Sequence, residues 1–268
     1  MTVASNTPAL EICNVAIGYG ERTVLHDLNF TVKQGEIFAI MGGSGCGKST
    51  LLKHIIGIYP LQAGEIKIFG RTISGSNTLS EEDIARTFGV TYQGGALLGS
   101  LTLAENVALA LEEHTVLSGK EIKAKVMEKL SWVNLEKFAD FYPAEISGGM
   151  KKRAGLARAL ALDPPLLFFD EPSAGLDPVS SADLDRLILK MRDEFKRTVV
   201  IVTHELDSVF TIADRIIMLD KDTGTIAETG DPRVLQKNAS IPWVRDFLSR
   251  DGLAYNLSDK EVKYVQNP

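Results

Sequence analysis

The sequence is poor in the features that mark several classes of protein. It has two cysteines, Cys13 and Cys46, in 268 residues. Two cysteines are too few for a disulfide framework, and neither shows the Cys/His spacing of a zinc site, so no structural metal is expected. No apolar run approaches the roughly 18 to 20 residues needed to cross a bilayer. We therefore do not expect this polypeptide to span a membrane.

The sequence also lacks an excess of positive charge. The 29 Lys and Arg residues against 35 Asp and Glu residues give a formal net charge of −6. This balance argues against a primary binder of DNA or another polyanion, so no nucleic-acid partner is expected. The N-terminal segment has no Lys or Arg before Arg22 and no apolar signal core. We therefore expect no secretory signal and a cytoplasmic chain.

The chain does contain enough apolar residues for a packed core. Hydrophobic residues make up 44% and charged residues 24% of the sequence, as in an ordinary globular protein. The length permits one large α/β domain or two small ones.

The order of the patterns favours an α/β fold. Strands are expected over 10–17, 28–32, 35–41 and 64–70, with a helix over 48–56. Residues 101–162 have a helical pattern, including a capping box from Ser118 to Glu121, and resemble an inserted helical subdomain. Strands over 166–169 and 198–203 then flank a helix that follows Asp177 and Pro178.

A glycine-rich segment predicts a phosphate-binding loop. Residues 42–49 read GGSGCGKS and match G-x-x-x-x-G-K-[ST] between an apolar strand and a helix. Backbone N–H groups and the helix N-terminus would hold phosphates, Lys48 would neutralise the β- and γ-phosphates, and the Ser49 hydroxyl would hold Mg²⁺. The predicted ATP-binding residues here are Gly42, Gly43, Ser44, Gly45, Cys46, Gly47, Lys48, Ser49 and Thr50. The Cys46 thiol is either activated by Lys48 and the helix N-terminus or is simply a tolerated small residue.

Two carboxylates follow a second apolar strand. The sequence LLFFDE at 166–171 would deliver Asp170 to the magnesium ion and Glu171 to the γ-phosphate side. Taken alone, the pair is better explained by solvation of the strand end or by helix capping. With the phosphate loop upstream, Glu171 is the predicted residue that orients or deprotonates the attacking water. Such a group raises the rate of hydrolysis by roughly 10²- to 10⁴-fold.

A third motif indicates a family. The sequence ISGGM at 146–150, followed by a helical run, resembles the LSGGQ signature of ABC-type ATPases, and further family elements follow in order over residues 9–235. The resemblance implies a P-loop NTPase fold with a helical subdomain near 101–162 and an antiparallel β subdomain. It also implies an adenine-stacking role for Tyr19, a Q-loop role for Gln93 in catalysis and at the magnesium ion, a D-loop role for Asp177 and a catalytic switch role for His204. Each of these residues alone has an ordinary structural interpretation.

The signature itself predicts a second anion site. Ser147, Gly148 and Gly149 begin a helix whose first N–H groups have no partner within the helix. In the resembled family, two chains hold two ATP molecules between them, and the signature Ser147 to Met150 of one chain completes the site of the other. The motif departs from the family at Ile146 and at Met150, which cannot donate the amide hydrogen bond of glutamine. The basic run at 151–153 either strengthens the local positive field or forms a solvated helix face.

A narrower resemblance concerns substrate. The stretch 93–107, residues 112–115 and the Met-ended signature resemble the ATPase subunit of Mla/Mce-type phospholipid transporters, which maintain outer-membrane lipid asymmetry. This implies an ATP- and Mg²⁺-dependent homodimer, peripheral on the cytoplasmic face of the inner membrane. The implied partners are an integral membrane permease, an MCE-domain lipid-binding subunit and, in some systems, a STAS-domain subunit. The alternatives are an ABC ATPase of another transport system, or one of a cell-division or regulatory complex.

The final segment, 240–268, forms a predicted C-terminal extension. Ile241, Val244, Phe247 and Leu248 recur at helical spacing, with Trp243 alongside, and predict a short amphipathic helix. That helix either packs on its own domain, or the extension grips a partner ATPase subunit and raises its effective concentration.

Overall fold

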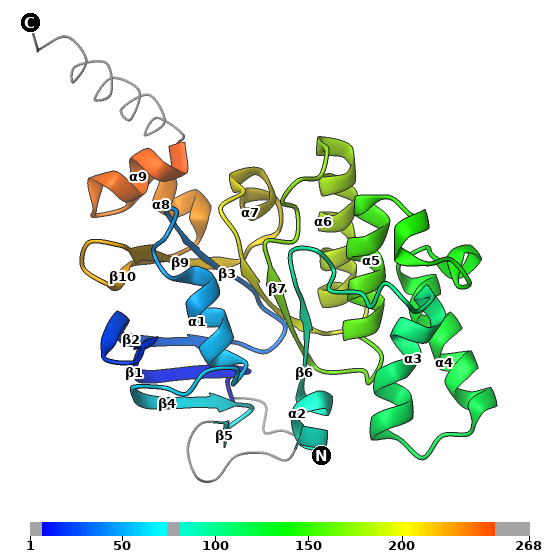
Figure 1. Cartoon of the computed structure of the whole chain (residues 1–268). Coiled ribbons are helices and arrows are strands. Elements are labelled where there is room, and N and C mark those ends of the chain that lie inside the picture. Colours follow the sequence, from blue (N-terminus) through cyan, green and yellow to red (C-terminus); the bar gives the residue numbers. More distant parts are fainter. Residues whose placement is uncertain (1–6, 74–80, 250–268) are drawn as a thin grey trace, which may run out of the picture.

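The strands form two sheets (Figure 1). The computed structural model describes residues 7–73 and 81–249. The smaller sheet is antiparallel, has the order β2-β1-β4-β5, and consists of β1 (Leu10–Tyr19), β2 (Arg22–Val32), β4 (Ala63–Ile68) and β5 (Arg71–Thr72). It is the antiparallel β part that the family resemblance implies.

The larger sheet has the order β10-β9-β3-β8-β7-β6. Its strands are β3 (Ile37–Gly42), β6 (Phe88–Thr91), β7 (Leu166–Asp170), β8 (Thr198–Val202), β9 (Arg215–Asp220) and β10 (Thr225–Gly230). All neighbouring pairs are parallel except β9 with β10. Every residue of β3 and β8 is buried, because both faces of a parallel sheet are covered.

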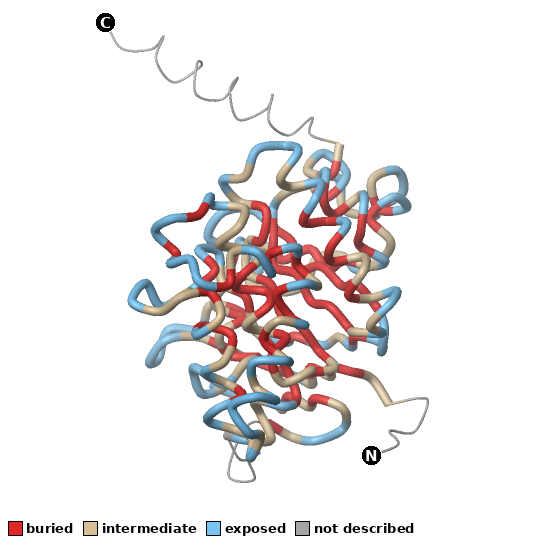
Figure 2. Tube along the Cα trace, turned by 90° about the vertical axis from the view of Figure 1, so that its right-hand side faces the viewer, coloured by how far each residue is buried: buried red, intermediate tan, exposed pale blue. Residues whose placement is uncertain are grey.

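Alternation along β3 divides the interior among three apolar clusters. Phe38 and Ile40 face a cluster shared with the antiparallel sheet and α1 (Lys48–Ile55). Ile37 faces the helical side of the molecule, and Ala39 and Met41 face the C-terminal helices. Successive side chains of a strand point to opposite faces, so one strand serves cores on both sides. In Figure 2 the buried segments run through the centre of the molecule.

The helical pattern at 101–162 corresponds to three α-helices and two 3₁₀ turns. They are α3 (Leu103–His114), α4 (Gly119–Trp132), η1 (Glu136–Phe138), η2 (Pro143–Glu145) and α5 (Gly148–Ala159). The predicted capping box is confirmed: the Ser118 hydroxyl accepts from the Glu121 N–H, and the Glu121 carboxylate accepts from the Ser118 N–H at 2.8 Å. Thr102 and Glu105 cap α3 in the same way. This block lies beside the larger sheet (Figure 1).

The remaining helices complete the fold. They are α2 (Glu81–Thr87), α6 (Pro178–Asp193), α7 (Leu206–Ile212), α8 (Pro232–Asn238) and α9 (Pro242–Ser249). The predicted C-terminal helix is α9, and its Val244 and Leu248 are buried against α8 and β9 in the chain's own domain. Residues 253–265 of the proposed gripping tail lie outside the described residues. The predicted domain limits, 9–235 and 240–268, stay predictions.

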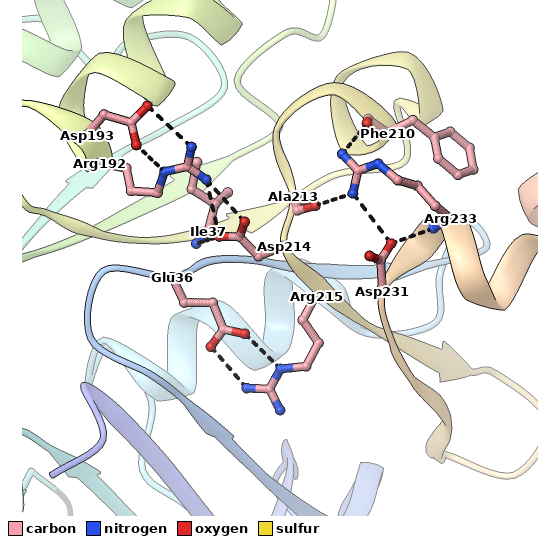
Figure 3. A network of polar contacts seen from close by, with 10 residues as sticks. All are labelled: Glu36, Ile37, Arg192, Asp193, Phe210, Ala213, Asp214, Arg215, Asp231 and Arg233. Atoms are coloured by element: carbon pink, nitrogen blue, oxygen red, sulfur yellow. Dashed lines mark hydrogen bonds and ion pairs between the residues drawn. The ribbon is translucent and has the colours of Figure 1, made fainter. Parts of the chain in front are cut away.

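A polar network joins the amino ends of β3 and β9 (Figure 3). Arg215 donates from Nε to Glu36 Oε1 at 2.8 Å and from an Nη to Glu36 Oε2 at 3.0 Å. Next to this pair, Asp214 accepts from the Ile37 N–H at 2.8 Å and from Arg192 at 3.1 Å. Glu36 is 9% exposed, so its ion pair is only weakly screened by water.

We predict that Glu36→Gln lowers the free energy of unfolding by about 2 kcal/mol, because a charged hydrogen-bond pair at a nearly buried site loses its ionic component. Urea unfolding followed by circular dichroism measures the change. The control is Asp193→Asn, which removes a carboxylate that pairs with Arg192 but is 59% exposed and should cost less than about 1 kcal/mol. Equal losses in the two variants would contradict a special role for the Glu36–Arg215 pair.

Candidate active site

The predicted phosphate loop connects β3 to α1. Gly42 and Gly47 have φ values of 147° and 102°, a region that side chains disfavour. A Cβ at Gly42 would lie 2.6 Å from both Cys46 Sγ and Leu219 O, and one at Gly47 would lie 3.0 Å from Leu25. The loop conformation therefore requires glycine at both positions, and the spacing of the motif has a direct structural cause.

The Lys48 ammonium is held within this loop. Its side chain donates from Nζ to Gly42 O at 2.9 Å and to Gly43 O at 3.1 Å, and the residue is 9% exposed. These two hydrogen bonds fix a positive charge inside the loop, at the N-terminus of α1. This arrangement suits a polyanionic ligand such as a triphosphate.

A hydroxyl and a carboxylate meet beside the loop. Ser49 donates from Oγ to Asp170 Oδ1 at 3.1 Å, although the two residues are 121 positions apart in the sequence. Burial raises the pKa of the Asp170 carboxyl, and the hydrogen bond from Ser49 acts in the opposite direction. Hard oxygen donors of this kind fit Mg²⁺, which typically takes one or two protein carboxylates and completes its shell with water and substrate phosphates.

Glu171 and His204 converge at the same edge of the sheet. Glu171 Oε1 lies 2.9 Å from His204 Nδ1, and Thr203 donates from Oγ1 to Glu171 Oε2 at 3.4 Å. Glu171 has a φ of 50°, a left-handed conformation that is uncommon for a side-chain-bearing residue and concentrates at functional sites. Its own N–H donates to Val202 O at 2.8 Å, which fixes the turn after β7 to the end of β8.

Most of these residues line one cleft of about 1070 Å³, although Asp170 and Thr203 are not part of its wall. Of the predicted site residues, its wall includes Gly42, Gly43, Ser44, Gly45, Gly47, Lys48, Ser49, Thr50, Gln93, Glu171 and His204. The sequence did not assign Val24, Leu206, Trp243, Asp246 or Phe247 to this site, yet they line it as well. The last three belong to α9, and no local motif around them marks a nucleotide site.

Two predicted ATP-binding residues lie outside the cleft wall. Tyr19 is 47% exposed, its hydroxyl lies 3.3 Å from Thr50 Oγ1, and its ring meets that of Tyr59 edge-on. Cys46 is 2% exposed beneath the loop. Burial raises the pKa of the Cys46 thiol more than Lys48 lowers it, so the interpretation of an activated thiol is wrong and that of a tolerated small residue fits.

The signature segment lies away from this cleft. Ser147 caps α5 and accepts from the Met150 N–H at 3.3 Å, as its sequence predicts. Asp177 caps α6 and accepts from the N–H groups of Val179 and Ser180 at 3.0 Å each. Within the part of the chain that the structure describes, Ser147, Gly148, Gly149, Met150 and Asp177 do not line the cleft.

Helix α5 contacts two functional loops at once. A Cβ at Gly95 would lie 2.6 Å from Lys151 O, so the segment after Gln93 packs closely on the helix backbone. Lys152 donates from Nζ to the Ala174 carbonyl, in the loop between Glu171 and Asp177. Burial lowers the pKa of Lys152, while the carboxylates of Glu171 and Glu205 oppose this shift. Lys152 is therefore a structural contact rather than part of a solvated helix face.

Similarity to known proteins establishes the family of this chain. The sequence profile described as "ABC transporter" matches residues 25–174. The chain belongs to the ABC transporter family. A solved ABC structure, the dimeric post-hydrolysis state of the ATP-binding cassette MJ0796 bound to ADP and Pi, superposes with a TM-score of 0.72 at 32% identity, over 83% of this chain and 98% of that chain. The ABC ATPase fold predicted from the sequence is thereby confirmed.

Two relatives of this ABC protein have names that state a transport role. The intermembrane phospholipid transport system ATP-binding protein MlaF of Escherichia coli is 38% identical over 246 residues, which are 91% of this chain and 89% of the relative. The probable ribonucleotide transport ATP-binding protein mkl of Mycobacterium tuberculosis is 39% identical over 241 residues. The match covers 90% of this chain but only 66% of the mkl protein.

We predict that Lys152→Met lowers steady-state phosphate release by about tenfold, because the loop that joins Glu171 to Asp177 loses its tie to α5 and small misplacements in an active site are costly. ATP affinity should not change, since Lys152 does not line the cleft. Lys152→Arg should retain most of the activity. Lys151→Met, a neighbouring lysine on the same helix, is the matched control, and an equal effect of both Met variants would refute the assignment.

Proposed function

We propose that the chain binds ATP with Mg²⁺ in the cleft of about 1070 Å³ and hydrolyses the β–γ phosphoanhydride bond. Gly42 to Thr50 hold the phosphates, and Lys48 neutralises charge on the β- and γ-phosphates. Ser49, Asp170 and Gln93 hold Mg²⁺, which offsets phosphate charge when bound. Tyr19 stacks on the adenine from the rim of the cleft.

The single observation that carries this proposal is the contact between Glu171 and His204 in the cleft wall. Glu171 accepts the proton of the attacking water, and His204, 2.9 Å away, orients this carboxylate and faces the γ-phosphate. Thr203 holds the second carboxylate oxygen. A positioned base of this kind contributes roughly 10²- to 10⁴-fold to the rate.

We further propose that the active form is a homodimer in which each signature completes the cleft of the other chain. Two facts support this: Ser147 to Met150 lie outside their own chain's cleft, and the solved ABC cassette MJ0796 is dimeric. The N-terminus of α5 would supply N–H groups to the partner's γ-phosphate, and the D-loop residue Asp177 would lie at the same interface. Met150 offers no side-chain amide, so the backbone and Ser147 would carry the contact.

The proposed cargo is phospholipid, moved through a separate permease at the cytoplasmic face of the inner membrane. The MlaF name and the 89% coverage of that relative support this cargo, as do the motifs around Gln93 and Met150. Among the described residues, no helix has the length and apolar character to cross a membrane. MCE-domain and STAS-domain subunits are the further proposed partners. The name of the mkl relative supports ribonucleotide as a second candidate cargo.

For the chemistry, we predict that Glu171→Gln binds ATP with an affinity near that of the parent but lowers phosphate release by about 10²- to 10⁴-fold. Lys48→Ala should instead lose detectable nucleotide binding, because the loop loses its fixed positive charge. Equilibrium binding and steady-state phosphate release separate the two effects. A Glu171→Gln chain that hydrolyses ATP near the parent rate would overturn the role of general base.

For the coupling, we predict that Gln93→Ala reduces cargo movement more than basal hydrolysis, because Gln93 joins the cleft to the segment packed on α5. The complete complex, purified from native membranes, is reconstituted in liposomes and assayed for ATPase activity and for movement of phospholipid or ribonucleotide. Movement of ribonucleotide but not phospholipid would overturn the cargo assignment. Equal losses of transport and hydrolysis would assign Gln93 a purely catalytic role.

A further inference from the structure

A second cavity, of about 350 Å³, opens between α6 and α7. It adjoins the loop that contains Asp177 without including the phosphate loop, and Ser173, Leu176 and Pro178 form part of its wall. Its charged lining residues are Asp185, Arg186, Glu205 and Asp207. Three of these four side chains are acidic, so the cavity favours a positively charged group.

The Asp185 carboxyl is buried without a cationic partner among the described residues. Asp185 is 7% exposed, and the Ser208 hydroxyl is its hydrogen-bond partner. Burial raises the pKa of this carboxyl, and the Ser208 hydrogen bond only partly opposes the shift. The neighbouring Arg186 pairs with Asp183 at 2.8 Å instead. Burial of a carboxylate costs free energy, and a hydrogen bond from one neutral partner does not offset that cost.

A second polar group on the same wall has no partner. Ser173 is 5% exposed, and its Oγ makes no hydrogen bond within the described structure. Ser173, Asp185 and Ser208 all line both this cavity and a small void beneath it. An unpaired buried hydroxyl costs free energy, and here it lies at the cavity that also contains the carboxylate without a cation.

We propose that this cavity is a binding site for a single organic cation, a guanidinium or a primary ammonium group. Asp185 accepts a charge-assisted hydrogen bond from the cation, Ser173 accepts a second one, and Glu205 adds negative potential at the wall. A divalent metal ion fits less well, because the described residues contain no group of three or more His, Cys, Asp or Glu side chains that could hold one. The alternative is a structural role, in which the hydrogen bond between Asp185 and Ser208 joins α6 to α7. That role explains neither the unpaired Ser173 hydroxyl nor the burial of a carboxylate without a cation.

The test uses ethylguanidinium chloride as a probe of the full chain without nucleotide, followed by ligand-observed NMR at constant ionic strength. Its neutral analogue ethylurea is the control ligand. The parent should bind ethylguanidinium and not ethylurea, and Asp185→Asn should weaken binding by about tenfold or more, since the charge is lost while the shape is kept. Asp183→Asn, a more exposed carboxylate on the same helix, should bind like the parent.

Ser173→Ala keeps the proposal testable if Asp185→Asn alters the fold. It removes a buried hydroxyl with no partner, so the chain should unfold at an unchanged or higher urea concentration, while probe affinity falls about threefold. Absence of ethylguanidinium binding to the parent, equal binding of ethylurea, or unchanged affinity in both Asp185→Asn and Ser173→Ala would overturn the proposal. None of these measurements depends on ATP hydrolysis.

Two further arms identify the source of the cation. Spermidine, a free polyamine, replaces ethylguanidinium in the first arm, and affinity that depends on Asp185 would assign the site to soluble amines. In the second arm, the Glu171→Gln chain is incubated with ATP to favour the proposed dimer. Loss of ethylguanidinium binding under these conditions would assign the group to a lysine or arginine of a second copy, since that side chain would already occupy the cavity.

Discussion

The active site depends on one constraint, the parallel pairing of β8 between β3 and β7. Parallel strands end at the same edge, so this pairing brings together the phosphate loop after β3, Glu171 after β7 and His204 after β8. The Ser49–Asp170 and Glu171–His204 contacts are its direct consequences. The three strands are packed on both faces, and they hold in place the loops that contain the functional side chains.

Helix α5 extends this base toward the helical side. Its backbone supports the segment after Gln93, and its Lys152 side chain reaches the loop between Glu171 and Asp177. Movement of the helical block would therefore act on the cleft and on the Asp177 loop together. The proposed coupling between Gln93 and cargo movement rests on this link.

The C-terminal helix has a different relation to the site. Val244 and Leu248 anchor α9 on the chain's own domain, and Gln236 donates to the Leu248 carbonyl at 3.2 Å. Its Trp243, Asp246 and Phe247 also line the wall of the nucleotide cleft. The amphipathic pattern correctly predicted a helix and its buried stripe, but a stripe does not specify which surface it covers.

The sequence by itself determined the features that depend only on neighbouring residues, namely the glycine-rich loop and the helix caps. The glycine spacing at 42–47 follows from positive φ values and close backbone contacts, and the Ser118, Ser147 and Asp177 caps follow from hydrogen bonds within one turn. Only the tertiary structure decided how distant groups meet. It buried Cys46 and raised the pKa of its thiol, tied Lys152 to Ala174, and placed Asp185 and the unpaired Ser173 hydroxyl in one cavity. These outcomes depend on desolvation and on long-range packing, which short-range patterns do not encode.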